Sequence, residues 1–279
     1  MNNQFLNCRG HIISLKDPLI MGILNTTSDS FFDGGRYSDE PSWLRQAEKM
    51  LNEGASIIDV GCVSTRPGAA AVDEAAELKK MTNVVTSLIK NFPKIIISAD
   101  TYRSKVAIAA IHAGATIIND ISGGSMDDEM YETIARLQVP YVLMHIQGTP
   151  ETMQRNPVYH DVTKEVVRFF SEKTNKLRLM GVNDIIIDPG FGFGKTPEHN
   201  FQMMRELYMF KFIPHPILIG ISRKSMIWKT LKTSPAEALN GTTVLNTIAL
   251  INKANILRVH DVKEARECLE LINRCDFPT

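Results

Sequence analysis

Each of eight short apolar segments of the chain ends in a polar side chain of a type that binds ligands or takes part in catalysis. In chain order these side chains belong to Asn25, Asp59, Asp100, Asn119, His145, Asp188, Ser222 (with Lys224 just beyond it) and Arg258 (with His260). One such residue is as often structural as functional. A whole series is harder to explain that way, because burying many carboxylates and amides without partners is costly. A ligand rich in hydrogen-bond donors would supply those partners.

The chemistry of these side chains indicates a ligand with two different ends. A carboxylate can accept two parallel N–H bonds from the amino-amidine edge of a planar heterocycle, and Asn119 can both donate and accept at a ring nitrogen. Lys224, Arg223, Arg258 and His260 add positive charge near the last two segments. The stretch around Lys224 also opens a helix, whose free N–H groups favour anions. The sequence therefore predicts one end of the site for a heterocycle and the other for a phosphate.

The segments that end in these residues read as parallel strands, because most are apolar without alternation and are bounded by helical patterns. Strands are predicted at Leu19–Asn25, Ser56–Gly61, Ile95–Asp100, Thr116–Ile121, Tyr141–Ile146, Asp184–Asp188, Pro216–Ser222 and Ile256–His260. Helices are predicted near 42–53, 73–90, 103–113, 127–137, 161–180, 198–210, 235–252 and 262–274.

The unbroken β-then-α order predicts an α/β fold, a (β/α)8 (TIM) barrel, as one domain over residues 1–279. A weak repeat supports it: Gly54 and Gly114 each end a predicted helix and lead directly into a strand. A doubly wound sheet is the alternative, disfavoured by the lack of a nucleotide-loop glycine pattern. Residues 4–15 read as a short N-terminal β-hairpin that could plug the bottom of the barrel. In such barrels the carboxyl ends of all strands meet at one rim, so the polar strand ends would converge.

Composition excludes several classes of protein. The chain has 279 residues with 44% hydrophobic and 22% charged side chains and a formal net charge of zero. A neutral chain has no global field to attract nucleic acid or an anionic membrane. Apolar runs are too short to cross a bilayer, and the N-terminus does not read as a secretory signal. We therefore expect a cytoplasmic protein whose four cysteines are buried free thiols.

Two loops rich in small residues, 26–35 and 64–69, are candidate lids over the predicted rim. A third loop, Gly190–Lys195, has the look of a phosphate loop, but its spacing is not that of a P-loop, and we discount it. His145 is a possible metal ligand, although one histidine without nearby partners is more often a satisfied rim residue.

Several of these segments together resemble the dihydropteroate synthase family. The resemblance rests on the motifs at Met21–Phe31 with Asp33–Gly35, Ile58–Gly61 with Ser64–Gly68, Asp100–Thr101, Ile118–Asp120, Asp188–Gly190, Ser222–Lys224 and Arg258–Asp261. They fall in order from about residue 19 to 261 and include most of the polar strand ends. The family implies a single (β/α)8 barrel, usually a homodimer, that joins 6-hydroxymethyl-7,8-dihydropterin diphosphate to 4-aminobenzoate. The products are 7,8-dihydropteroate and pyrophosphate, made in folate biosynthesis, and the cofactor is Mg2+.

The resemblance also implies roles for individual residues. The pterin would be bound by Asp100, Asn119, Met144, Asp188, Phe193, Lys224 and Arg258. Asn25, Arg258 and His260 would hold the diphosphate, with Asn25 also a ligand of Mg2+. Phe31, Thr65, Arg66, Pro67 and Ser222 would frame the 4-aminobenzoate, which sulfonamide inhibitors of the family mimic, and Asp33 would belong to the closing first loop. The residues expected to be catalytic are Asp100, Lys224, Arg258 and His260.

The chain departs from the family pattern at two places. Cys62-Val63 stands where Gly-Glu is common, and Thr27-Ser28 stands where Thr-Pro is usual. Neither change removes a residue expected to contact a ligand, but both could alter loop order and inhibitor fit.

Three other functions are alternatives to this one. A methyltetrahydrofolate-dependent methyltransferase shares a pterin-binding barrel but would need neither the 64–68 loop nor a diphosphate end. An inactive pterin-binding or assembly protein would show altered strand ends, and none is seen. A metal-dependent aldolase would want clustered His and Glu ligands at the rim, which the sequence lacks.

Overall fold

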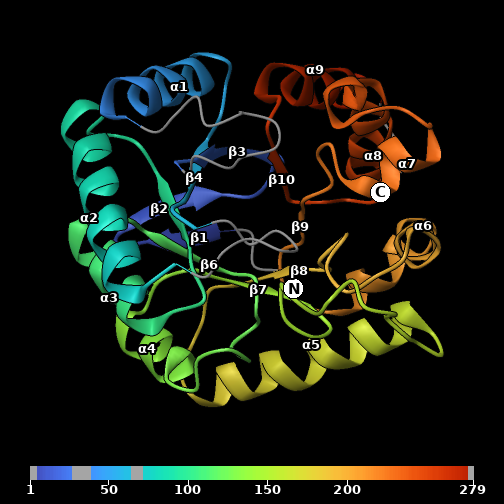
Figure 1. Cartoon of the computed structure of the whole chain (residues 1–279), viewed down its shortest axis with the longest axis horizontal. Helices are drawn as coiled ribbons and strands as arrows, with labels where there is room; N and C mark the ends of the chain where they lie inside the picture. The colour runs from blue at the N-terminus through green and yellow to red at the C-terminus, as the bar shows by residue number, and fades with distance from the viewer. Residues whose placement is uncertain (1–4, 27–38, 64–71, 276–279) are drawn as a thin grey trace.

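The computed structural model describes residues 5–26, 39–63 and 72–275. They form a parallel β-barrel surrounded by helices, with a separate two-stranded hairpin (Figure 1). The hairpin strands are β1 (Phe5–Cys8) and β2 (His11–Ser14). The barrel strands are β3 (Leu19–Asn25), β4 (Ile57–Gly61), β5 (Ile97–Asp100), β6 (Ile117–Asp120), β7 (Tyr141–Met144), β8 (Ile185–Asp188), β9 (Leu218–Ile219) and β10 (Ile256–Val259).

Helices follow the barrel strands in the chain. They are α1 (Glu40–Asn52), α2 (Glu74–Asn91), α3 (Ser104–Ala113), α4 (Met130–Leu137), α5 (Val162–Leu179), α6 (Pro197–Arg205), α7 (Ser225–Thr230), α8 (Leu239–Ile251) and α9 (Val262–Ile272), with 3-10 turns η1 (Leu207–Phe212) and η2 (Pro235–Glu237). Aspartate side chains begin α1, α2 and α5 by accepting backbone N–H bonds of the first turn. Gly54 and Gly114 have φ of +98° and +121°, so the predicted left-handed helix ends are confirmed.

The strand order confirms the barrel and excludes the doubly wound sheet. Hydrogen-bonded parallel neighbours run β8-β7-β6-β5-β4-β3-β10-β9. The two ends of this series meet at a single parallel bridge between Ile187 and Ile217. There the Ile187 N–H donates to the Pro216 carbonyl at 2.9 Å, so the sheet is nearly closed.

Three predicted elements differ most from the structure. Strand β9 spans Leu218–Ile219 instead of 216–222, because it pairs with β10 only at these two positions. The helix predicted at 198–210 is divided into α6 and η1. The helix predicted from 235 begins instead with η2, where the Glu237 carboxylate accepts the Ser234 N–H at 3.2 Å, and α8 follows.

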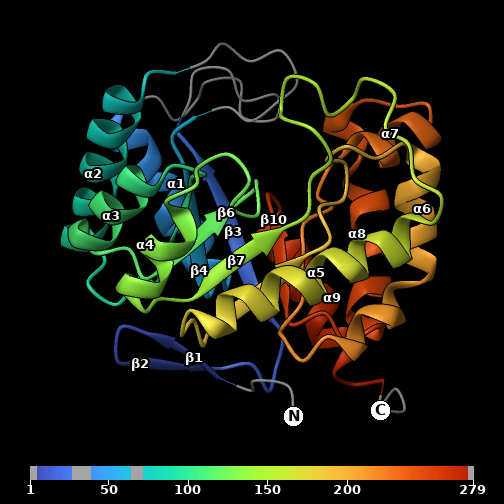
Figure 2. The ribbon, with the colours of Figure 1, turned by 90° about the horizontal axis from the view of Figure 1, so that it is seen from below.

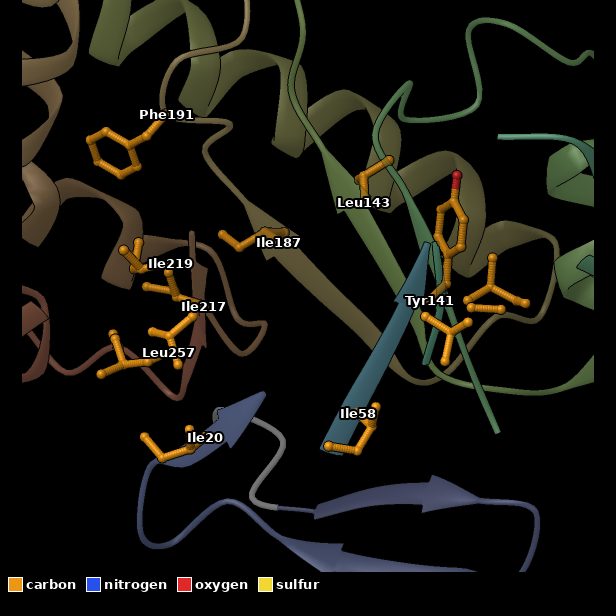
Figure 3. Packing of buried hydrophobic residues seen from close by; sticks show 14 of the residues in the cluster. Ile20, Ile58, Tyr141, Leu143, Ile187, Phe191, Ile217, Ile219 and Leu257 are labelled. Atoms are coloured by element: carbon orange, nitrogen blue, oxygen red, sulfur yellow. The ribbon is translucent and has the colours of Figure 1, made fainter. Parts of the chain in front are cut away.

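The strands are apolar on both faces because each face packs against a different layer. Outward residues such as Ile58, Leu143 and Leu257 pack in the large core between barrel and helices (Figure 3). Inward residues one position away, such as Ile57 and Val142, form a second cluster inside the barrel. This arrangement explains why the strand segments do not alternate in the sequence until their last residues.

The hairpin covers the end of the barrel at which the strands begin (Figure 2). Its residues Leu6 and Cys8 and the following Leu15 are buried in the inner cluster with first-turn strand residues such as Met21 and Ile256. The predicted hairpin and its place are therefore confirmed.

The cysteines were predicted less well. Cys8, Cys62 and Cys268 are buried free thiols, but Cys275 is exposed, because it lies beyond the end of α9. Within the described ranges, no helix combines the length and apolar character needed to span a bilayer.

Candidate active site

The polar strand ends lie together on the inner rim of the barrel. Asn25 is in register with Gly61, Gly61 with Asp100, and Asp100 with Asn119, across four neighbouring strands. Because side chains alternate along a strand, a residue two positions after an inward one also points inward. Ile117 belongs to the inner cluster, and Asn119 follows it by two. The inner face is therefore apolar at its base and polar at its carboxyl end.

A hydrogen-bond network joins four strands on one side of this rim. Arg258 on β10 donates from Nε to Asp59 Oδ2 at 2.7 Å and from a terminal nitrogen to Asp100 Oδ2 at 2.8 Å. Asn119 donates from Nδ2 to the same Asp59 oxygen at 3.1 Å. Residues up to 199 positions apart are thus within bonding distance. The predicted convergence of Asp59, Asp100, Asn119 and Arg258 is confirmed.

This network has unused acceptors. Asp59 Oδ1 and Asp100 Oδ1 are buried and have no hydrogen-bond partner among the described residues. Burial and the neighbouring Asp59 raise the pKa of Asp100, while Arg258 opposes them. Burial disfavours the Arg258 cation, but the two carboxylates hold the pKa of its guanidinium above the usual value. A ligand with an N–H group would satisfy the free oxygen of Asp100, which is the more exposed of the two carboxylates.

The other side of the rim carries a carboxylate and a lysine. Asp188 is buried at the end of β8, and its Oδ1 accepts the Gly190 N–H at 2.8 Å. The Lys224 ammonium donates to the Phe191 carbonyl and lies 4.6 Å from the centre of the Phe193 ring. Burial lowers the pKa of Lys224 to about 8, although Asp188 opposes the shift. Burial raises the pKa of Asp188, against the charge of Lys224.

Ser222 and His260 meet beside this lysine. The backbone N–H of His260 donates to Ser222 Oγ at 3.2 Å, and His260 Nδ1 lies at the same distance from that oxygen. Ser222 follows β9, and His260 follows β10. The hydroxyl therefore fixes the histidine ring at the edge of the site.

An apolar wall and two glycines shape the space between these groups. Met144 is buried with Ile121, and Phe193 packs against them. A Cβ on Gly220 would lie 3.8 Å from Arg258 and 3.9 Å from Asp188 Oδ2, and one on Gly61 would lie 3.0 Å from Asn25 Oδ1. The absence of side chains at these glycines leaves room for a flat group between the acidic and basic residues.

Two side chains that the sequence suggested for the site form their bonds with other groups. Arg223 was expected to face the site, but its guanidinium forms two 2.8 Å bonds with Asp261 and donates to the carbonyls of Pro235 and Ala236. His145 Nδ1 lies 2.9 Å from the ammonium of Lys195, as expected for a satisfied rim residue. The helical stretch predicted after Ser222 is the six-residue α7.

Sequence reasoning missed two residues that organise the site. Asp59 was recognised as a strand end but received no role. Lys195 was discounted with its loop, yet its buried side-chain nitrogen donates to the carbonyls of His145, Gly190 and Phe193. The sequence feature that could have indicated a role for Lys195 is the series of glycines at 190, 192 and 194. Their positive φ angles let the loop fold around a side chain.

Five of the predicted site residues lie outside the described part of the chain. They are Phe31, Asp33, Thr65, Arg66 and Pro67. Their assignment to the 4-aminobenzoate site and to the closing loop therefore stays a prediction.

Comparison with known proteins identifies the family of this chain. The sequence model of the pterin binding enzymes matches residues 21–260. The dihydropteroate synthase of Escherichia coli K12 is 42% identical over 269 residues, which is 96% of this chain and 95% of that protein. The crystal structure of Yersinia pestis dihydropteroate synthase in complex with a sulfonamide drug superposes with a TM-score of 0.93 at 39% identity, covering 97% of this chain and 98% of that one.

A second solved structure of a dihydropteroate synthase is also similar to this chain. Xanthomonas albilineans dihydropteroate synthase with 4-aminobenzoic acid gives a TM-score of 0.90 at 35% identity and covers 98% of both chains. These relatives are synthases, which favours the synthase over the methyltransferase alternative. By these matches, which agree with carboxylates and basic side chains gathered on one barrel rim, the chain belongs to the dihydropteroate synthases of the pterin-binding enzyme family.

Proposed function

We propose that this chain joins 6-hydroxymethyl-7,8-dihydropterin diphosphate to 4-aminobenzoate, with release of pyrophosphate, as the family resemblance implies. The observation that carries the proposal is the shared rim, where a buried oxygen of Asp100 has no partner among the described residues and where Arg258 and Asp188 border the space left by Gly220. A flat ring with several N–H groups fits the carboxylates of this rim. An anionic leaving group fits its basic side chains.

In this proposal the pterin lies between the two halves of the rim. Asp100, Asn119 and Asp188 accept from its N–H groups. Lys224 binds one of its acceptors, Arg258 stacks on the ring, and Met144 and Phe193 line it. The support comes from neighbouring contacts. Arg258 bonds to Asp100 and borders the space of Gly220 together with Asp188, while Lys224 lies over the Phe193 ring, which packs with Met144.

Asn25, Arg258 and His260 are assigned to the diphosphate. In the described residues no three His, Cys, Asp or Glu side chains gather as a metal site. Asn25 offers one neutral oxygen, and Mg2+ prefers to keep water and phosphate ligands beside few protein oxygens. These residues therefore fit an ion held mainly by the diphosphate, where it would neutralise charge on the leaving group.

4-Aminobenzoate is assigned to Ser222 together with Phe31, Thr65, Arg66 and Pro67. The structures of the relatives contain 4-aminobenzoic acid in one case and a sulfonamide drug in another. By the same proposal, this chain would bind sulfonamides in competition with 4-aminobenzoate.

The reaction needs charge stabilisation more than proton transfer. The bond between the pterin CH2 and the diphosphate oxygen breaks, and its electron pair leaves with pyrophosphate. Arg258 and His260 stabilise that departing anion. Asp100 stabilises the positive charge that develops on the pterin. The neutral arylamine nitrogen then forms the C–N bond and loses its proton to solvent, so no strong base is required.

The test is a coupling assay with both substrates, in which pyrophosphate release and dihydropteroate formation are measured together. We expect equal amounts of both products with Mg2+, and a large loss of rate when Mg2+ is chelated. Omitting 4-aminobenzoate is the control. Product formation from methyltetrahydrofolate, or no pyrophosphate, would contradict the proposal.

The role of Asp100 has its own test. Asp100→Asn keeps the size of the side chain but removes its charge, so kcat should fall far more than pterin affinity. Steady-state rates and calorimetric binding of the pterin separate the two effects. An unchanged kcat would remove this role from Asp100.

We further propose a homodimer in the cytoplasm, as the family resemblance implies. Support for self-association comes from α8, where Val244 and Ile251 lie two helical turns apart with 51% and 38% of their surface exposed. Light scattering on the purified chain should give twice the mass of 31.2 kDa. A monomeric mass at micromolar concentration would contradict the dimer.

A further inference from the structure

Asp59 holds a central position in the site although its side chain is fully buried. It is the middle residue of β4, points into the barrel and has 0% of its surface exposed. Its Oδ2 accepts one hydrogen bond from Asn119 on β6 and one from Arg258 on β10. Both donors belong to residues that the proposed function assigns to the pterin.

The bond to Asn119 decides which end of that amide a ligand meets. An ionised carboxylate only accepts hydrogen bonds, so the amide nitrogen must face Asp59. The amide oxygen of Asn119, which is a hydrogen-bond acceptor, is then the atom left to bind a ligand. Without Asp59 the amide could turn over, because its two ends have nearly the same shape.

The bond to Arg258 limits the guanidinium in the same way. Its Nε is taken by Asp59, and one terminal nitrogen is taken by Asp100. Two carboxylates on neighbouring strands therefore hold the guanidinium in a single orientation on the rim. A planar group held at two points offers a fixed surface to a flat ring.

We propose that Asp59 is a positioning residue for the pterin, which fixes Asn119 as a hydrogen-bond acceptor and holds Arg258 in its stacking orientation. The inference rests on the proposed function. It adds that the donor-and-acceptor pattern of the pterin site is set by a carboxylate below the ligand, and that this pattern selects a ring edge with N–H groups.

The first test is Asp59→Ala. It removes the one oxygen that accepts from both Asn119 and Arg258, so the Asn119 amide is free to turn over and the guanidinium keeps only its bond to Asp100. We expect the KM for the pterin diphosphate to rise about ten- to hundredfold, as for loss of a hydrogen bond in a charged network. The KM for the arylamine substrate should stay within about twofold of the wild-type value. A purely structural role would affect both substrates or only the melting temperature.

The second test restores only the shared acceptor. In Asp59→Asn the amide oxygen can take the place of Oδ2 and accept from both Asn119 and Arg258, because both bonds end on that one atom. We expect its pterin affinity to lie within about fivefold of wild type and clearly above that of Asp59→Ala.

Ser98→Ala is the matched control. Ser98 is the register partner of Asp59 on β5, is equally buried, and its hydroxyl has no partner among the described residues. This variant should keep the KM values for both substrates. Asp59→Asn keeps an acceptor for both donors, so its pterin affinity relative to wild type still tests the inference if Asp59→Ala does not fold.

Binding of 6-hydroxymethyl-7,8-dihydropterin, measured by calorimetry, separates this inference from the proposed function. Wild-type coupling activity together with unchanged pterin binding in Asp59→Ala would overturn the inference alone. Parallel rises of the KM for both substrates, or a folded Asp59→Asn variant that binds the pterin no better than Asp59→Ala or far more weakly than wild type, would also overturn it. A wild-type chain that binds the pterin without coupling would remove the proposed function, and the binding series would still decide the role of Asp59.

Discussion

At the scale of single residues, the chemistry of the site depends on ionisable side chains that are buried. Asp100 and Asp188 have raised pKa values mainly because they are buried, and burial lowers the pKa of Lys224. Such opposite shifts bring acids and bases closer to neutral pH. Activity should therefore depend on pH in a range where ordinary aspartates and lysines do not titrate.

Lys224 should set the basic limit of the pH profile. Its pKa is lowered to about 8 by burial, so the ammonium is lost as pH rises through that value. We expect kcat/KM for the pterin diphosphate to fall above pH 8, approaching tenfold per unit. Lys224→Arg keeps its charge and should abolish this limb, even if its rate is lower. Initial rates at saturating 4-aminobenzoate measure the effect, and a flat wild-type profile to pH 9.5 would contradict it.

Gly220→Ala should block the pterin without disturbing the fold. The added methyl group has ordinary contacts of 3.8 and 3.9 Å with Arg258 and Asp188. It would, however, occupy the space proposed for the ring. We expect pterin affinity to fall about tenfold or more, while the free energy of unfolding changes by less than about 0.5 kcal/mol. Calorimetry and urea titration check the two parts, and unchanged affinity would show that the ring lies elsewhere.

At the scale of elements, the loop between β8 and α6 illustrates how a connection is made rigid. Lys195 donates to three carbonyls, two of them in this loop and one at the end of β7. Gly190 has φ of +69°, and a Cβ there would lie 2.0 Å from the His145 carbonyl. The loop is thus held against the strand end, which fixes Phe193 and, through the Phe191 carbonyl, Lys224.

Lys195→Met should destabilise the protein strongly. The methionine fills similar volume but leaves buried carbonyls without a donor, and each such group costs about 1–3 kcal/mol. We expect the free energy of unfolding to fall by about 3 kcal/mol or more in urea titrations. The control Lys79→Met, at an exposed position of α2, should change it by less than about 0.5 kcal/mol. Equal effects of the two substitutions would contradict a structural role for the buried ammonium.

At the scale of the whole molecule, the barrel separates stability from function along its axis. The hairpin and the inner apolar cluster close the end where strands begin, and the polar rim occupies the other end. His215 belongs to the chain just before β9, is buried, and has its pKa lowered to about 4 by burial and, to a lesser degree, by Arg178. His215 therefore makes the stability of the fold sensitive to acid, independently of the groups in the site.

Protonation of His215 should weaken the fold below neutral pH. The unfolded chain binds this proton near pH 6.5, whereas the folded one does so only near pH 4. The stability that it contributes is therefore complete above pH 6.5 and is lost as pH falls toward 4, by about 3 kcal/mol. His215→Leu should remove this part of the loss between pH 7.5 and 4.5 in urea titrations. The exposed His112→Gln should keep the wild-type slope, and equal slopes for His215→Leu and wild type would contradict the prediction.

The sequence by itself determined the order of strands and helices, because apolar runs and glycine helix ends are local signals. It also indicated the rim, since parallel strands must bring Asp100, Asp188 and Arg258 to one end of a barrel. Only the tertiary structure decided which groups these side chains bond to. Arg223 forms its ion pair with Asp261, and Lys195 donates to three backbone carbonyls. Asp59 accepts hydrogen bonds from both Asn119 and Arg258. Those choices depend on distances between segments up to 199 residues apart, and no local pattern in a chain encodes such distances.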